Sequence, residues 1–168
     1  NLTQIRYFSR FTFPVHKPRT FVSTGYEGTL GWGLATGLRA PTVKPNVPVI
    51  SIAGDGGFIY NIQEIATAVP HKIPLILIIF NYNAFGNLKY MQQEIFNGRT
   101  IATDLVSPNF VTLAETFGAT GIQAQNPDKL RETIKTGLRN NGPVVIKVPF
   151  GTFPSPWDYV ILPKISVS

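Results

Sequence analysis

The chain has 168 residues, 43% hydrophobic and 14% charged, so it can bury the core of one domain and is too apolar to be disordered. It has no cysteine, which excludes disulfides, thiolate metal sites and cysteine nucleophiles. Its net charge of +6 comes from 15 basic residues spread without a run or helical stripe, which disfavours nucleic acid as a partner.

Strands and helices are predicted to alternate along the chain, from the spacing of its apolar residues. Strands are expected at residues 20–23, 47–53, 74–80 and 143–148, and helices at 29–39, 61–69, 109–118 and 127–140. Asn109 is expected to cap the third of these helices, and Gly118 to end it. The alternation predicts an α/β fold, with a doubly wound, mostly parallel sheet and helices on both faces.

Residues 1–149 are expected to form this domain, and residues 150–168, rich in proline, an irregular C-terminal tail. No apolar stretch approaches the roughly 20 residues of a membrane-spanning helix, so we expect no membrane partner. Residues 1–4 show neither an initiator Met nor a signal-peptide pattern. We therefore expect a processed or excised chain that is cytoplasmic.

Polar residues follow two of the predicted strands at the points where those strands end. Gly54-Asp55-Gly56-Gly57 follows strand 47–53, and Asn81-Tyr82-Asn83 follows strand 74–80. Open α/β sheets bind ligands beyond the carboxyl ends of their strands, so we expect the two segments to meet. A carboxylate beside an Asn carbonyl oxygen suits Mg²⁺ bound to phosphate, and glycine N–H groups near a helix start suit the phosphate.

Three segments carry a resemblance to a known family: residues 54–58 (GDGGF), 63–69 (QEIATAV) and 81–86 (NYNAFG). Together they resemble the diphosphate-binding, C-terminal domain of thiamine-diphosphate-dependent enzymes of the acetolactate synthase, pyruvate decarboxylase and benzoylformate decarboxylase type. The likeness extends over nearly the whole chain. It implies thiamine diphosphate and Mg²⁺ as cofactors. It also implies a lyase or transferase that acts on a small 2-oxo acid, as a decarboxylase or a carboligase.

The resemblance also implies roles for individual residues. In the glycine-rich segment 25–31, the Gly28 carbonyl would accept a hydrogen bond from the 4′-amino group of the cofactor. Leu30 would hold the two cofactor rings in their bent arrangement. The full set implied to bind the cofactor is Thr3, Gln4, Gly28, Leu30, Gly54, Gly56 and Gly57.

The expected metal site departs from the family at one position. Asp55 matches the first ligand, but alignment on Phe85-Gly86 places Tyr82 where the family has its Asn ligand. A neutral phenol is a poor ligand for Mg²⁺. Asn83 is therefore predicted as the second metal ligand, with Asn81 as the alternative, and magnesium affinity is expected to be weakened or lost.

The family's activating Glu, which bonds the pyrimidine N1′, lies on a separate pyrimidine-binding domain, and Glu27 does not match it. The resemblance therefore implies a fragment or subunit without its own catalytic acid. Its expected partner is a pyrimidine-binding domain of the same or another subunit, in a homodimer or homotetramer.

Two other interpretations stay open. One is a non-catalytic module of the same fold that serves cofactor retention or subunit assembly. The other, less favoured, is an unrelated nucleotide-binding domain, because the sequence lacks Gly-x-Gly-x-x-Gly directly after a strand. His16 and His71 are expected to be surface or structural residues.

Overall fold

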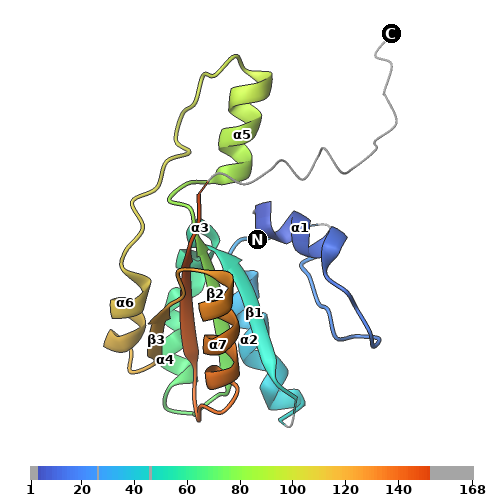
Figure 1. Ribbon diagram of the computed structural model, residues 1–168, viewed down its shortest axis with the longest axis vertical. Helices are drawn as coiled ribbons and strands as arrows, with labels where there is room; N and C mark the ends of the chain where they lie inside the picture. The colour runs from blue at the N-terminus through green and yellow to red at the C-terminus, as the bar shows by residue number, and fades with distance from the viewer. Residues whose placement is uncertain (1–3, 26, 46, 152–168) are drawn as a thin grey trace.

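The computed structural model describes residues 4–25, 27–45 and 47–151 of the chain (Figure 1). The strands are β1 Val49–Gly54, β2 Leu75–Asn81, β3 Thr120–Gln123 and β4 Val144–Pro149. The helices are α1 Gln4–Thr12, α2 Trp32–Val43, α3 Asp55–Phe58, the 3-10 helix η1 Ile59–Glu64, α4 Ile65–Ala68, α5 Gly86–Ile95, α6 Phe110–Thr116 and α7 Pro127–Gly137.

The four strands make one parallel sheet in the order β1-β2-β4-β3. β2 is central and almost wholly apolar, and its residues from Leu75 to Ile79 are all buried, as expected of a strand covered on both faces. β1 lies at an edge, and its two faces differ. Ala53 is buried, whereas Ile50 and Ile52 are 43% and 38% exposed.

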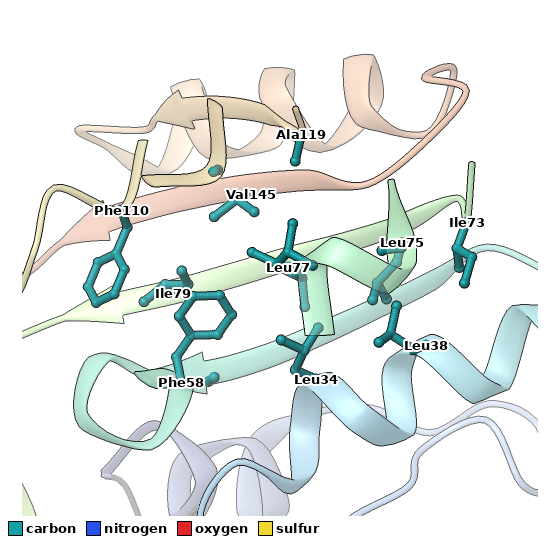
Figure 2. Close-up of a cluster of buried hydrophobic side chains, with 14 residues drawn as sticks. Leu34, Leu38, Phe58, Ile73, Leu75, Leu77, Ile79, Phe110, Ala119 and Val145 are labelled. Atoms are coloured by element: carbon teal, nitrogen blue, oxygen red, sulfur yellow. The ribbon is translucent and has the colours of Figure 1, made fainter. Parts of the chain in front are cut away.

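Helices cover the sheet from both sides, which confirms the predicted doubly wound α/β fold. On one face, α2, α3, α4 and α6 pack over alternate strand residues, and Figure 2 shows Leu34 and Leu38 of α2 directed at the strand that carries Leu75 and Leu77. On the other face, Leu130 and Ile134 of α7 pack against the second apolar cluster, which is Ile76, Ile78, Ala124, Val144 and Ile146.

Several predicted boundaries are confirmed. The Asn109 side chain accepts a hydrogen bond from the Val111 N–H and caps α6, and Gly118 follows that helix with a φ of +84°. The helix predicted at residues 61–69 starts earlier, at Asp55. It runs through three short pieces, with non-helical backbone at Asn61. His16 and His71 are both exposed, as expected.

The strand predicted at residues 20–23 is wrong. These residues have no regular structure, and Val22 is 63% exposed. The apolar run there makes no ladder with another strand in the described chain, and a short run without such a ladder has little to hold it extended. The predicted division at residue 149 stays a prediction, because residues 152–168 lie outside the described ranges.

Helices α1 and α5 and strand β3 were not predicted from the sequence. α5 extends beyond the carboxyl end of the sheet (Figure 1), and its apolar residues Leu88 and Ile95 are 53% and 62% exposed. Within the described residues, no helix combines the length and hydropathy needed to cross a membrane.

Candidate functional site at the carboxyl end of the sheet

The strand register brings the two predicted polar segments together. Gly54 pairs with Phe80 across β1 and β2, so Asp55 and Asn81, the next residue of each segment, are neighbours. Asn81 in turn pairs with Pro149 of β4, which places Phe150 beside Tyr82. Three strand ends therefore converge on one point, as the sequence predicted for two of them.

Asp55 is the centre of this convergence, and its carboxylate is 3% exposed. Its Oδ1 accepts a hydrogen bond from the Gly56 N–H at 2.9 Å. Its Oδ2 accepts four: from the Asn81 side-chain amide at 3.1 Å, the Tyr82 N–H at 3.0 Å, the Asn83 N–H, and the Ser107 hydroxyl at 3.3 Å. The carboxylate is thus fixed by the end of β2, the turn after it and Ser107, and within the described part of the chain Oδ1 has one donor against four for Oδ2.

No cation of the described chain neutralises Asp55. The three ion pairs of that part of the chain, Lys89–Asp104, Lys129–Glu132 and Arg131–Asp128, all lie elsewhere. Buried charges in proteins are normally paired or bind a metal ion. The described residues hold no cluster of three or more His, Cys, Asp or Glu that could bind a metal ion. Asp55 fits a hard cation that draws further oxygen ligands from a bound phosphate.

A pocket opens beside Asp55 at this end of the sheet. Its walls include the glycines 54, 56 and 57 of the first turn, and Ala84, Phe85 and Gly86 of the second. Ile5 of α1 and Leu30 close it from the N-terminal part of the chain. The pocket combines a buried carboxylate, glycine backbone and apolar walls, an arrangement suited to a ligand with an anionic and an aromatic part.

Tyr82 lines the pocket as part of an aromatic cluster with Phe80 and Phe150. Its ring lies 5.4 Å from the Phe150 ring, and Phe150 also packs edge-on against Phe80 at 5.7 Å. The Phe150 N–H donates to the Asn81 carbonyl, which continues the β2–β4 ladder past the end of β4. Phe150 was predicted to begin the irregular tail, so its place in the pocket wall was missed.

Asn83 has a different environment. Its side chain is exposed and its backbone is left-handed, with φ of +58°, a conformation that Asn tolerates better than most residues. The Asn83 Oδ1 accepts a hydrogen bond from the Asn81 Nδ2 at 2.8 Å. Asn83 is not in the pocket wall, and its assignment as a metal ligand stays a prediction.

The glycine-rich segment borders the pocket and is held by α1. Arg6 donates to the Gly25 carbonyl at 2.9 Å, and Arg10 donates to the Ser23 hydroxyl at the same distance. Burial, with Arg10 nearby, lowers the pKa of Arg6. Gly28 is buried with φ of +65°, which strains any other residue, although it is not in the pocket wall itself.

The predicted cofactor-binding residues therefore fall into three groups. Leu30, Gly54, Gly56 and Gly57 lie in the pocket wall beside Asp55. Gly28 is a neighbour of Leu30 in the chain. Gln4 is the first residue of α1 and its side chain is not described, and Thr3 lies outside the described residues.

Ser107 is a site residue that the sequence did not reveal. It lies in the connection between α5 and α6 and reaches Asp55 across 52 residues of sequence. No local pattern marks it, because its contact depends on how this connection folds back over the strand ends. Two backbone hydrogen bonds of 2.8 Å hold the connection there, from the Phe85 N–H to the Thr103 carbonyl and from the Leu105 N–H to the Asn83 carbonyl.

Comparison with known proteins identifies relatives of this arrangement. Residues 3–148 match the family described as "Thiamine pyrophosphate enzyme, C-terminal TPP binding domain". The chain is 36% identical over 143 residues to an acetolactate synthase of Bacillus subtilis, covering 85% of this chain and 25% of the relative. It is 34% identical over 149 residues to the acetolactate synthase isozyme 3 large subunit of Escherichia coli, covering 86% of this chain and 26% of the relative.

Solved structures of other proteins share this fold. The benzoylformate decarboxylase of Polynucleobacter necessarius superposes with a TM-score of 0.79 at 26% identity, covering 90% of this chain and 29% of that one. The 4-hydroxybenzoylformate decarboxylase of Rhodococcus jostii RHA1 superposes with a TM-score of 0.71 at 30% identity, covering 76% of this chain and 24% of that one. The chain spans about a quarter of the length of the relatives it matches. By sequence and by fold, the chain belongs to the family of C-terminal, thiamine-pyrophosphate-binding domains of thiamine pyrophosphate enzymes.

Proposed function

We propose that this chain binds thiamine diphosphate through Mg²⁺ held by Asp55, as the diphosphate-holding domain of a 2-oxo acid decarboxylase or carboligase. The observation that carries the proposal is the buried Asp55 carboxylate, which lines the pocket, has no cationic partner in the described chain and has one oxygen with a single described donor. When bound, thiamine diphosphate stabilises the negative charge that develops when a 2-oxo acid loses carbon dioxide.

The contribution of this chain is binding and orientation. Asp55 would supply a charged oxygen to Mg²⁺, with Asn83 as the second side-chain ligand and Asn81 as the alternative. Leu30, in the pocket wall, would set the position of the cofactor rings, and Phe85 and Phe150 would keep water from that side. The residue that activates the cofactor would come from a pyrimidine-binding domain of the same or a partner subunit. The complete enzyme would be a homodimer or homotetramer. We expect it to be cytoplasmic.

Titration calorimetry of the intact protein with thiamine diphosphate tests this proposal. We expect binding in the presence of Mg²⁺ and little binding after the metal is removed with a chelator. Asp55→Asn keeps the size of the side chain but removes its charge, and should weaken cofactor binding by more than about 100-fold. Even substitutions of residues that only hydrogen-bond to metal ligands cost roughly 10–100-fold in metal affinity. Asp104→Asn is the matched control, because Asp104 is exposed and pairs with Lys89 instead.

Metal-independent cofactor binding, or equal binding by Asp55→Asn, would refute the role of Asp55.

A second candidate function is a non-catalytic module that keeps the fold and its assembly contacts. It is favoured by Tyr82, whose ring packs on Phe150 in the pocket at the position where a side-chain oxygen ligand is expected. If the intact protein binds neither Mg²⁺ nor thiamine diphosphate, this second function replaces the first.

A further inference from the structure

The two oxygens of the Asp55 carboxylate differ in the number of hydrogen bonds that they accept. Among the residues that the structure describes, four donors converge on Oδ2, and one, the N–H of the adjacent Gly56, reaches Oδ1. Three of the Oδ2 donors belong to the last residue of β2 and the turn after it, which the sheet register brings close to Asp55. The fourth, the Ser107 hydroxyl, is the only donor within the described ranges that comes from outside the two strand ends.

The segment that carries Ser107 is fastened to the same turn. The Phe85 N–H donates to the Thr103 carbonyl, and the Leu105 N–H donates to the Asn83 carbonyl, each at 2.8 Å. The Leu105 side chain packs directly over Gly56, where an added Cβ would come within 2.8 Å of the Leu105 Cδ1. The segment from Thr103 to Ser107 is therefore built into the wall around Asp55 and brings Ser107 to a fixed place.

A hydroxyl in this place can orient the carboxylate. A serine can donate one hydrogen bond, and bonds to a charged acceptor are stronger than those to a neutral one. With Oδ2 bonded on the side of Ser107 and of the β2 turn, the carboxylate cannot rotate freely, and Oδ1 keeps capacity for another partner. Outer hydrogen-bonding groups of this kind fix the ligands of metal sites and raise metal affinity.

We propose that Ser107 is a positioning residue for the metal site, which orients the Asp55 carboxylate so that Oδ1 faces the cation. The inference rests on the proposed function, because it assumes that Asp55 binds a divalent cation. It adds the α5–α6 connection to the metal site, whereas the sequence predicted metal ligands at the strand ends alone.

The test measures metal affinity directly. Mn²⁺ is titrated into the intact protein at a fixed concentration of thiamine diphosphate, and the electron paramagnetic resonance signal of the free ion gives the dissociation constant. Ser107→Ala should raise that constant roughly 10-fold, as expected for loss of one outer hydrogen bond. Ser107→Thr keeps the hydroxyl and should restore affinity to within about threefold of the unmutated protein, given the same hydrogen bond.

A matched control separates positioning from general destabilisation. Ser51 donates through its hydroxyl to the Gly33 carbonyl at 2.8 Å and does not touch Asp55. Ser51→Ala should lower the thermal midpoint while the Mn²⁺ constant stays unchanged. Normal Mn²⁺ binding by Ser107→Ala, or no rescue by Ser107→Thr, would overturn the inference alone. Absence of Mn²⁺ binding by the unmutated protein would overturn the proposed function and this inference with it.

Discussion

The segment around Asp55 begins at the end of β1, and helix α5 begins shortly after the end of β2, yet these two regions are built in opposite ways. Asp55 is 3% exposed and its carboxylate is enclosed by hydrogen bonds. In α5 the apolar residues Leu88 and Ile95 are more than half exposed, and the helix lies beyond the end of the sheet (Figure 1). The difference indicates that the packing of this chain secures the site turn, while α5 adds little to the stability of the core.

The largest effect expected from this comparison comes from one substitution made in both regions. Ile79 in β2 is fully buried, and Ile95 in α5 is 62% exposed. Ile79→Ala leaves a cavity and should lower the free energy of unfolding by about 2–5 kcal/mol. Ile95→Ala should change it by less than about 0.5 kcal/mol. Denaturant unfolding of the intact protein measures both, and similar losses would show that α5 is packed as firmly as the sheet.

A smaller effect is expected at Gly56, where the wall of the site is tightest. A Cβ added there would lie 2.6 Å from the Phe85 Cε1 and 2.8 Å from the Leu105 Cδ1. Gly56→Ala should therefore cost about 1–3 kcal/mol of stability through overpacking. It should also weaken thiamine diphosphate binding by displacing Phe85 from the pocket wall. If stability and cofactor affinity are both unchanged, the wall is more adaptable than its contacts indicate.

The smallest change, and the one that sharpens the description of the metal site, is expected at Tyr82. Tyr82→Asn supplies an amide oxygen next to Asp55 and loses the ring contact with Phe150, which is worth about 0.5–1.5 kcal/mol. We expect metal affinity to rise roughly 10-fold, which corresponds to about 1.4 kcal/mol. Tyr82→Phe, which keeps the ring, is the control and should leave metal affinity unchanged. Unchanged affinity in Tyr82→Asn would show that Tyr82 does not displace a ligand.

Sequence reasoning located the strand ends because buried parallel strands are continuous apolar runs and end at recognisable glycine and asparagine turns. The meeting of Asp55 with Asn81 was predicted in this way, and the cap at Asn109 was predicted from the helical spacing that follows it. The short strand expected at residues 20–23 was wrong because its formation depends on a neighbouring strand, which no local pattern reports. α5 carries a detectable signal, the helical spacing of Leu88, Met91 and Ile95, although the structure leaves all three side chains exposed.

The parts of the site that escaped prediction depend on long-range packing. Ser107 reaches Asp55 over 52 residues, and Phe150 enters the pocket wall through the β2–β4 register. Neither residue type suggests a role by itself, since serine is common in loops and phenylalanine in cores. Only the order of strands in the sheet shows that the end of β4 lies next to that of β2.

The most direct test of the central claim is a crystal structure of the intact protein with thiamine diphosphate and Mn²⁺, examined through the anomalous scattering of the metal. The account predicts one strong anomalous peak at a bonding distance of about 2.1 Å from an Asp55 carboxylate oxygen, next to the diphosphate. The same map would show whether Asn83, Asn81 or neither supplies the second side-chain ligand. A cofactor bound without a metal at Asp55, or a metal held elsewhere, would contradict the account.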